Sequence, residues 1–155
     1  MINRRTFIKS GVLTGMGLLT SELIFPKESG MYENSEKRVG IIGLDTSHSI
    51  AFTKLLNTTE TNEYKGYKVT AAYPYGSRTI ESSFKRIPGY IDEVKKYNVE
   101  IVGSIEDLLK KTDVILLETN DGRLHLEQAL PVFKAGKRIF IDKPVAGSLT
   151  DAICI

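Results

Sequence analysis

Cysteine and histidine are scarce in this chain, and each shortage excludes a kind of site. Cys154 is the only cysteine among 155 residues, so a disulfide framework within the chain and a cysteine-based metal site are both excluded. The two histidines, His48 and His125, have no acidic cluster beside them in the sequence. Because zinc sites need several such ligands together, we expect no metal site.

Excess charge is also small, and it is confined to one end of the chain. The formal net charge is +2, and residues 1–30 account for it with four basic and two acidic residues. The remainder is balanced, with 17 basic and 17 acidic residues. A balanced domain lacks the basic surplus that binds nucleic-acid phosphates. We therefore expect no nucleic-acid partner.

Residues 1–30 have the composition of a targeting segment. The pair Arg4-Arg5 precedes Phe7, and an apolar, glycine-rich run covers 11–19. A basic head followed by an apolar stretch is typical of an export signal, and the paired arginines resemble the twin-arginine translocation signal. We therefore expect an exported protein, periplasmic or envelope-associated, that meets the membrane only through this signal.

Two other interpretations of this segment remain open, an amphipathic helix and a short membrane anchor. Glu22 interrupts the apolar run, which is shorter than the roughly 20 residues of a membrane-spanning helix. No alanine precedes Ala51, so the signal is either cleaved at an atypical place or retained. Residues 31–37 are polar in character and are expected to form a linker.

Residues 38–155 alternate short apolar runs with helical segments. Strands are expected at 38–44, 67–73, 99–102, 114–117 and 138–141, and helices at 46–57, 91–97, 104–111 and 124–135 and from 148 onward. This alternation predicts βαβ units in an α/β fold with a parallel sheet. Right-handed crossovers favour a Rossmann-type doubly wound order. Because the chain ends within its last helix, we expect the sheet to be incomplete at its C-terminal end.

The loop after the first strand occupies the place of a dinucleotide-binding fingerprint. Gly40 and Gly43 precede a helix start at Thr46, Ser47 and His48, whose free N–H groups suit a pyrophosphate. The second and third glycines of the usual pattern are replaced, so an ordinary strand–turn–helix is the alternative. An aspartate at position 45 would repel a pyrophosphate, and we expect it to point away or to cap the helix.

The loop after the second strand contains no acidic residue to bind the ribose hydroxyls of NAD. Ser77 and Arg78 stand there instead, and they suit the 2′-phosphate of NADP. A solvated loop with an exposed arginine is the equal alternative. His48 is as readily a capping or packed residue as a functional one, whereas His125 begins a helix close to the switch in strand order.

Lys143 is the strongest single candidate for a catalytic residue. It follows Asp142 at the end of the fifth strand, on the sheet edge where ligands of such folds bind. A lysine there can orient a substrate hydroxyl or transfer its proton while hydride moves to a nicotinamide. The alternative is a loop lysine paired with Asp142.

Two segments together resemble the Gfo/Idh/MocA oxidoreductases. They are Thr119-Asn120-Asp121-Gly122-Arg123-Leu124-His125 and the run from Ala135 to Ala146, which contains Asp142-Lys143-Pro144. The resemblance covers residues 38–155 and implies an NAD- or NADP-binding Rossmann domain. It also implies hydride transfer on a sugar- or polyol-like substrate, with Lys143 as the family lysine near the nicotinamide and the substrate. From their places after the fourth and fifth strands, we expect His125 to be a further catalytic residue and Thr119, Asn120, Asp142 and Lys143 to contact the cofactor.

Members of this family carry a further α/β domain that builds the substrate pocket and often a homo-oligomer. We expect that domain to be absent from this chain. An oxidoreductase domain that is active only with its missing half is one interpretation. A truncated, catalytically inactive nucleotide-binding module is the other.

Overall fold

The computed structural model describes residues 36–58, 64 and 66–155. The expected signal and most of the expected linker lie outside these residues. Within the described part, no helix is long and apolar enough to cross a membrane.

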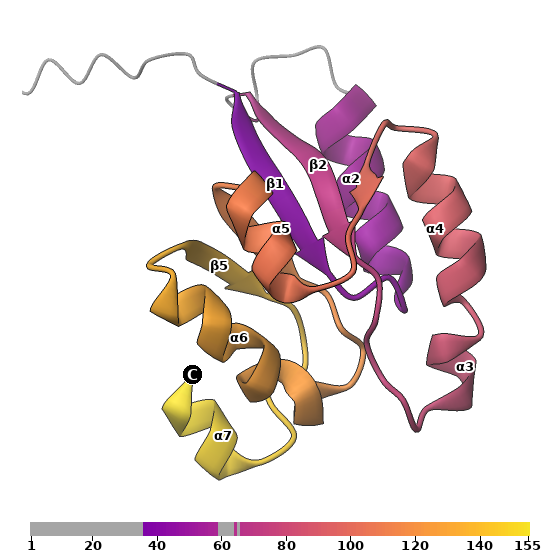
Figure 1. Cartoon of the computed structure of the whole chain (residues 1–155). Helices are drawn as coiled ribbons and strands as arrows, with labels where there is room; N and C mark the ends of the chain where they lie inside the picture. The colour runs from indigo at the N-terminus through magenta and orange to yellow at the C-terminus, as the bar shows by residue number, and fades with distance from the viewer. Residues whose placement is uncertain (1–35, 59–63, 65) are drawn as a thin grey trace, which may run out of the picture. The chain divides into compact units, whose positions relative to one another are not determined.

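The core of the domain is a parallel sheet of five strands (Figure 1). Its spatial order is β3-β2-β1-β4-β5, and all pairs are parallel. The strands are β1 (Lys37–Ile42), β2 (Tyr67–Tyr73), β3 (Glu100–Ile101), β4 (Val114–Leu117) and β5 (Arg138–Ile141). The strand order reverses direction between β1 and β4, which confirms the expected doubly wound Rossmann topology.

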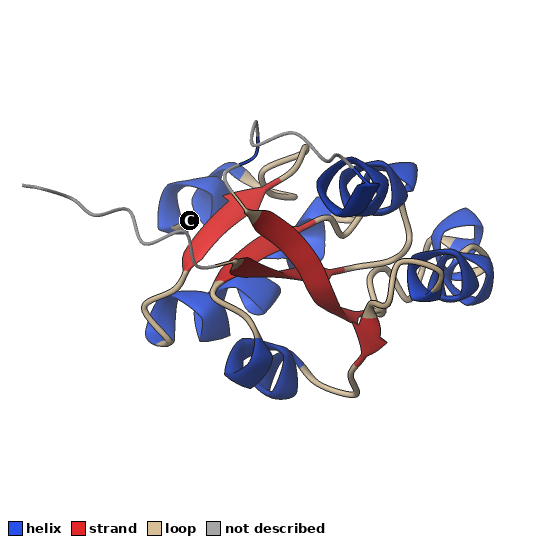
Figure 2. Ribbon diagram, turned by 90° about the horizontal axis from the view of Figure 1, so that it is seen from above, coloured by secondary structure: helices blue, strands red, loops and turns tan. Residues whose placement is uncertain are grey.

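Helices cover both faces of this sheet (Figure 2). On one face lie α2 (Ser47–Thr58) and α4 (Ile87–Lys95), and on the other lie α5 (Ile105–Lys111) and α6 (His125–Lys134). Three shorter helices complete the domain: α3 (Glu81–Phe84), η2 (Gly122–Leu124) and α7 (Leu149–Cys154). The helices lie on two faces because right-handed crossovers place those between β1 and β3 on one face. The chain then returns to β4 and continues to β5 in the opposite direction across the sheet, which places the later helices on the other face.

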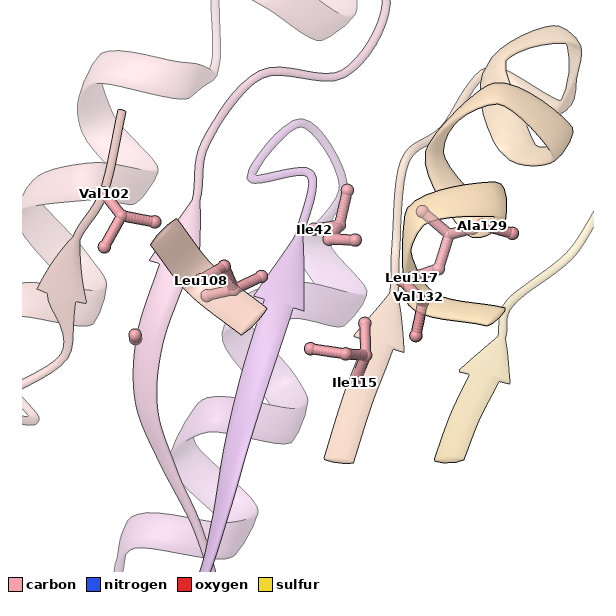
Figure 3. Close-up of a cluster of buried hydrophobic side chains, with 8 residues drawn as sticks. Ile42, Val102, Leu108, Ile115, Leu117, Ala129 and Val132 are labelled. Carbon is pink, nitrogen blue, oxygen red and sulfur yellow. The ribbon is translucent and has the colours of Figure 1, made fainter. Parts of the chain in front are cut away.

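Two apolar clusters fill the spaces between the sheet and its helices. Ile42, Ile115 and Leu117 pack against Leu108 of α5 and Val132 of α6 (Figure 3). The second cluster joins alternate residues of the same strands to the opposite helices; its buried members are Val39, Ile41, Leu44, Val69, Ala72, Val94 and Val99. A sheet buried on both faces requires such nearly continuous apolar strands.

Local signals place most of these elements where the sequence predicts them. Ser104 and Ser148 accept hydrogen bonds from backbone N–H groups three residues on, as N-caps do. Thr46 precedes α2, and its Oγ1 lies 3.4 Å from the backbone N of His48. The four-residue helix α3 was not expected, and α4 begins at Ile87 rather than at 91 because Pro88 fits its first turn.

Candidate active site at the switch in strand order

The loops after β1 and β4 meet at the switch in strand order, and Gly43 lets them meet. Its φ is 92°, and a Cβ added there would lie 2.6 Å from the backbone N of Thr119. A side chain is therefore excluded by both backbone conformation and space. This is the tight turn that the first glycine of a dinucleotide fingerprint provides.

Gly40 has a packing role in the structure. A Cβ at Gly40 would lie 2.9 Å from Ile115 Cδ1 and 2.9 Å from Thr112 Oγ1. The glycine thus lets α5 approach β1 closely, on the face opposite α2. This packing accounts for a glycine at position 40 without a cofactor, and the expected contact of Gly40 with a cofactor stays a prediction.

Asp45 joins three loops through its buried carboxylate. Oδ2 accepts a hydrogen bond of 3.0 Å from the backbone N–H of Ser77, and Oδ1 accepts one of 3.0 Å from that of Asn120. The side chain has no exposed surface. It points away from the start of α2, which is one of the two expected orientations, and it does not cap that helix.

Three residues expected to bind a cofactor donate side-chain hydrogen bonds to other protein groups. The Ser77 hydroxyl donates to Asp121 Oδ2 at 3.0 Å, and that of Thr119 donates to Gln128 Oε1 at 2.6 Å. The Asn120 amide donates to Ser83 Oγ at 2.9 Å. These bonds hold the loops in place. They occupy the buried hydroxyls of Ser77 and Thr119, whereas the exposed Asn120 engages only its amide nitrogen, and the expected contacts of all three with a cofactor stay predictions. Sequence spacing alone could not reveal partners that tertiary packing supplies.

Two arginines at this edge differ in their surroundings. Arg123 binds Asp121 with an Nη2–Oδ2 distance of 2.7 Å. This contact, helped by the Ser77 hydroxyl, outweighs burial and lowers the pKa of Asp121 to about 2. Arg78 is exposed and forms no ion pair with another described residue. It remains available to a ligand phosphate.

His125 is enclosed rather than presented to the cleft. Its Nε2 lies 2.6 Å from the Thr119 carbonyl oxygen and its Nδ1 lies 3.1 Å from that of Val145. The ring has no exposed surface, and it connects the loop after β4 to the loop after β5. Both ring nitrogens thus face backbone carbonyl oxygens, which suits a positioning role, and the catalytic role expected of His125 stays a prediction.

The chemically richest part of the site gathers His48, Glu118, Asp142 and Lys143. His48 lies in the first turn of α2, Glu118 follows β4, and the other two follow β5. The His48 Nδ1 lies 2.5 Å from Asp142 Oδ2, and Lys143 Nζ lies 3.8 Å from the same oxygen. One ligand atom each from His48, Glu118 and Asp142 lies within 4.8 Å of the others. The expectation that no acidic groups accompany the histidines is therefore wrong for His48.

The two carboxyl groups of this cluster titrate in opposite directions. Burial, together with the charge of Asp142, raises the pKa of Glu118 to about 8 despite the nearby Lys143 ammonium. Burial also disfavours the charged form of Asp142. The backbone N–H of Lys143 and the His48 ring outweigh it and lower the pKa of Asp142. Near neutral pH the site thus holds one carboxylate and one largely protonated carboxylic acid.

Lys143 is the most accessible member of the cluster. Its side chain is 75% exposed, against 15% for Asp142. The ammonium is free to reach a ligand beyond the carboxyl ends of the strands, where ligands of such sheets bind. The structure thus places Lys143 at the edge that the sequence predicts.

Glu118 was missed by sequence reasoning. It directly follows the apolar strand β4, and an acidic residue at that point of a parallel sheet lies on the ligand-binding edge. That placement was the available signal. The partners of Asp121 and Gln128, by contrast, are set by loops that no local pattern describes.

An apolar groove of about 420 Å³ lies elsewhere, along α2. Phe52, Leu116 and Phe140 line part of it, and the rings of Phe52 and Phe140 meet edge to face at 5.9 Å. Its lining consists of apolar and tyrosine side chains, so it brings no catalytic group together. The candidate site is therefore assigned to the polar cluster at the strand ends.

The reversal of strand order between β1 and β4, with α2 beginning at the reversal, defines a Rossmann nucleotide-binding domain. Residues 37–154 match the family model GFO_IDH_MocA, described as an oxidoreductase family with an NAD-binding Rossmann fold. The chain belongs to this family. The family's cofactor class agrees with the one expected from the sequence. Comparison with curated proteins gives no match.

Solved structures share this fold at low sequence identity. The dehydrogenase MviM from Clostridium difficile is 23% identical with a TM-score of 0.56, over 76% of this chain and 34% of that one. KijD10, a 3-ketoreductase from Actinomadura kijaniata in complex with TDP-benzene and NADP, is 20% identical with a TM-score of 0.52, over 77% and 34%. The transcriptional regulator Gal80p from Kluyveromyces lactis is 19% identical with a TM-score of 0.50, over 77% and 29%. The chain thus spans about a third of these proteins.

Proposed function

We propose that this domain binds NAD or NADP at the switch in strand order and serves hydride transfer between the nicotinamide and a hydroxyl or carbonyl substrate. The main observation in support of this proposal is the exposed Lys143 ammonium at the end of β5, beside the Asp142 carboxylate. A sugar- or polyol-like substrate is favoured because a ketoreductase crystallised with a TDP ligand and NADP shares the fold. Another domain would complete the substrate pocket.

The residues present fit a dinucleotide at two points. The turn at Gly43 leaves no room for a Cβ, which brings the β1 loop against Thr119. The start of α2 presents the exposed Ser47 and the half-buried Thr46, where backbone N–H groups and the helix dipole favour a pyrophosphate. The Asp45 carboxylate is held by two N–H groups on the far side, so it does not face that position.

In this proposal each polar group of the cluster has a separate task. When bound, the nicotinamide supplies the hydride chemistry. Lys143 holds the substrate oxygen. Its ammonium donates a proton when a carbonyl is reduced, and its neutral amine accepts the hydroxyl proton when a carbinol is oxidised. Asp142 balances the ammonium charge, and Arg78 meets a 2′-phosphate. His125 keeps the β4 and β5 loops in register through two carbonyl oxygens.

A non-catalytic nucleotide-binding module is the second candidate function. It is favoured by the contacts between the loops at this edge, in which the side chains of Ser77, Thr119 and Asn120 donate to Asp121, Gln128 and Ser83. The fold is also that of a transcriptional regulator, so the fold alone does not decide between the two.

Fluorescence titration of the full chain with NADH and with NADPH tests the proposed function. We expect saturable binding of at least one, and an NADPH preference that disappears in Arg78→Ala. Arg86→Ala, which removes another exposed arginine, is the matched control and should retain the preference. Absence of binding of both nucleotides at millimolar concentration would contradict the proposal. Binding without turnover in a protein that also holds a substrate domain would favour the second candidate.

We also propose that the chain is exported by the twin-arginine route. The support is the sequence alone, namely Arg4-Arg5 before an apolar run. That route suits a dinucleotide-binding domain, because its cofactor would have to be acquired before export.

A further inference from the structure

Glu118 is a buried polar residue of the site whose carboxyl oxygens have no hydrogen-bond partner among the described residues. Its side chain is 1% exposed, and neither Oε1 nor Oε2 has a hydrogen-bond partner. Buried polar groups are otherwise satisfied almost throughout folded proteins, and an unpartnered buried carboxyl carries a large desolvation cost. Its two free oxygens therefore indicate a ligand that they would bind.

The groups that face Glu118 are those that bind metal ions. His48 Nδ1 and Asp142 Oδ2 are 2.5 Å apart, and a Glu118 oxygen completes a set within 4.8 Å. The three residues lie at the start of α2 and directly after β4 and β5, so the fold fixes their relative positions. The His48 side chain is 38% exposed and that of Asp142 is 15% exposed, so solvent reaches two of the three candidate ligands.

We propose that His48, Glu118 and Asp142 bind a divalent first-row transition-metal ion, with zinc as the best match. One imidazole nitrogen and two carboxylate oxygens form a ligand set that zinc accepts at about 2.0–2.2 Å, and the Glu118 carboxyl releases its proton to the solvent when the ion binds. Magnesium and calcium prefer oxygen ligands alone, so the imidazole argues against them. Three protein ligands leave a fourth position for water or a substrate oxygen, as in catalytic zinc sites.

The geometry requires two adjustments. Two ligands of a tetrahedral zinc ion stand roughly 3.3 Å apart at these bond lengths. A Glu118 oxygen, which lies within 4.8 Å of the other two ligand atoms, has to approach them, and the His48 ring has to move away from Asp142 by somewhat less than 1 Å. Its partial exposure permits this movement. Lys143 is not a ligand in this arrangement, because its ammonium lies on the solvent side at 3.8 Å from Asp142 and is free to turn outward.

The test is titration of the metal-free full chain with Co²⁺, followed by competition with Zn²⁺, in the absence of nucleotide. We expect saturable binding of one ion with the visible d–d absorption of a tetrahedral Co²⁺ site, abolished by stoichiometric Zn²⁺. Loss of a supporting group around a metal costs about 10–100-fold in affinity. Loss of a ligand, in Glu118→Gln or His48→Ala, should therefore weaken binding by more than about 100-fold. Glu106→Gln, at an exposed glutamate of α5, is the matched control and should bind normally.

No saturable binding, or unchanged binding in a folded Glu118→Gln variant, would overturn the proposal. If that buried substitution prevents folding, the half-exposed His48→Ala variant decides the matter by the same readout. The metal site and the dinucleotide site are separable in these assays. Metal binding without NADH or NADPH binding contradicts only the proposed function, and the reverse result contradicts only the metal site.

Discussion

Asp45 accepts a hydrogen bond from the backbone N–H of Asn120 at 3.0 Å, across 75 positions of the sequence. The other oxygen of the same carboxylate holds the backbone N–H of Ser77. A single buried side chain thus fixes the loops after β1, β2 and β4 relative to one another. It stands where the dinucleotide fingerprint has its second glycine, so the rigidity of this edge depends on a departure from that pattern.

Replacing Asp45 with alanine should destabilise the domain by about 2–4 kcal/mol, because the buried N–H group of Ser77 and the partly buried N–H group of Asn120 lose a charged acceptor. Urea unfolding of the full chain measures the change. Asp92→Ala, at an exposed aspartate of α4, is the control and should change the free energy of unfolding by no more than about 0.5 kcal/mol. Equal, small effects of both substitutions would show that the Asp45 bonds contribute little.

Asp121 should make the domain less stable in acid. Its folded-state pKa, about 2, lies below the ordinary value of 3.8. The stabilisation is therefore complete above about pH 5 and is lost as the pH falls through about 4 to 2. We expect about 1–2 kcal/mol from this residue, less than the full shift implies, because its partner Arg123 is 63% exposed.

Urea unfolding near pH 6 and near pH 2.5 checks this assignment. Asp121→Asn should be less stable than the parent near pH 6, and the two should converge in acid. Arg38 also lowers the pKa of Asp113 to about 2. The Asp113 side chain is 37% exposed, against 7% for Asp121, and Asp113→Asn should give a smaller effect. A stability difference for Asp121→Asn that is constant with pH would assign its role to packing rather than charge.

The sequence predicts the sheet well because its signals are local. The bounds expected for β2, β4 and β5 agree with the structure, since each is a short apolar run enclosed by turn residues. Helix α3 was not predicted, because four residues carry no periodicity. A tertiary contact supports this helix instead, because the Asn120 side-chain amide donates a hydrogen bond to the Ser83 hydroxyl.

The candidate site is only partly predictable for a related reason. Lys143 and Asp142 could be placed because the end of a parallel strand marks the ligand edge. The roles of Ser77 and His125 could not, since a hydroxyl or an imidazole at that edge serves equally well as a ligand contact or as a bond between loops. Only their partners, Asp121 and two backbone carbonyls, decide between these roles.

Export should fail when both arginines of the N-terminal pair become lysines. The receptor of the twin-arginine route reads that pair, and an ammonium does not reproduce the planar donor geometry of a guanidinium. Fractionation of cells that express a tagged full chain measures the outcome. Lys9→Arg retains the charge and the pair, and it should be exported normally. Undiminished periplasmic appearance of the double variant would exclude the twin-arginine route.

Lys143→Ala should lower turnover by about 10²–10⁴-fold in a protein that joins this domain to a substrate domain, which is the usual effect of losing a general acid–base group. Lys143→Arg should restore little, because a guanidinium does not readily release its proton. Affinity for the nucleotide should change much less than turnover, since the exposed ammonium lies at the substrate side of Asp142 in this proposal. Lys134→Ala, at an exposed lysine of α6, is the control and should leave both quantities unchanged.

Measuring turnover and nucleotide affinity on the same variants distinguishes the possible roles of Lys143. An ammonium that only neutralised a phosphate would lose affinity and turnover in proportion, and Lys143→Arg would then recover both. An ammonium that only paired with Asp142 would leave turnover near normal. A large loss of turnover at nearly constant affinity, without rescue by arginine, is the result that a proton-transferring lysine alone produces.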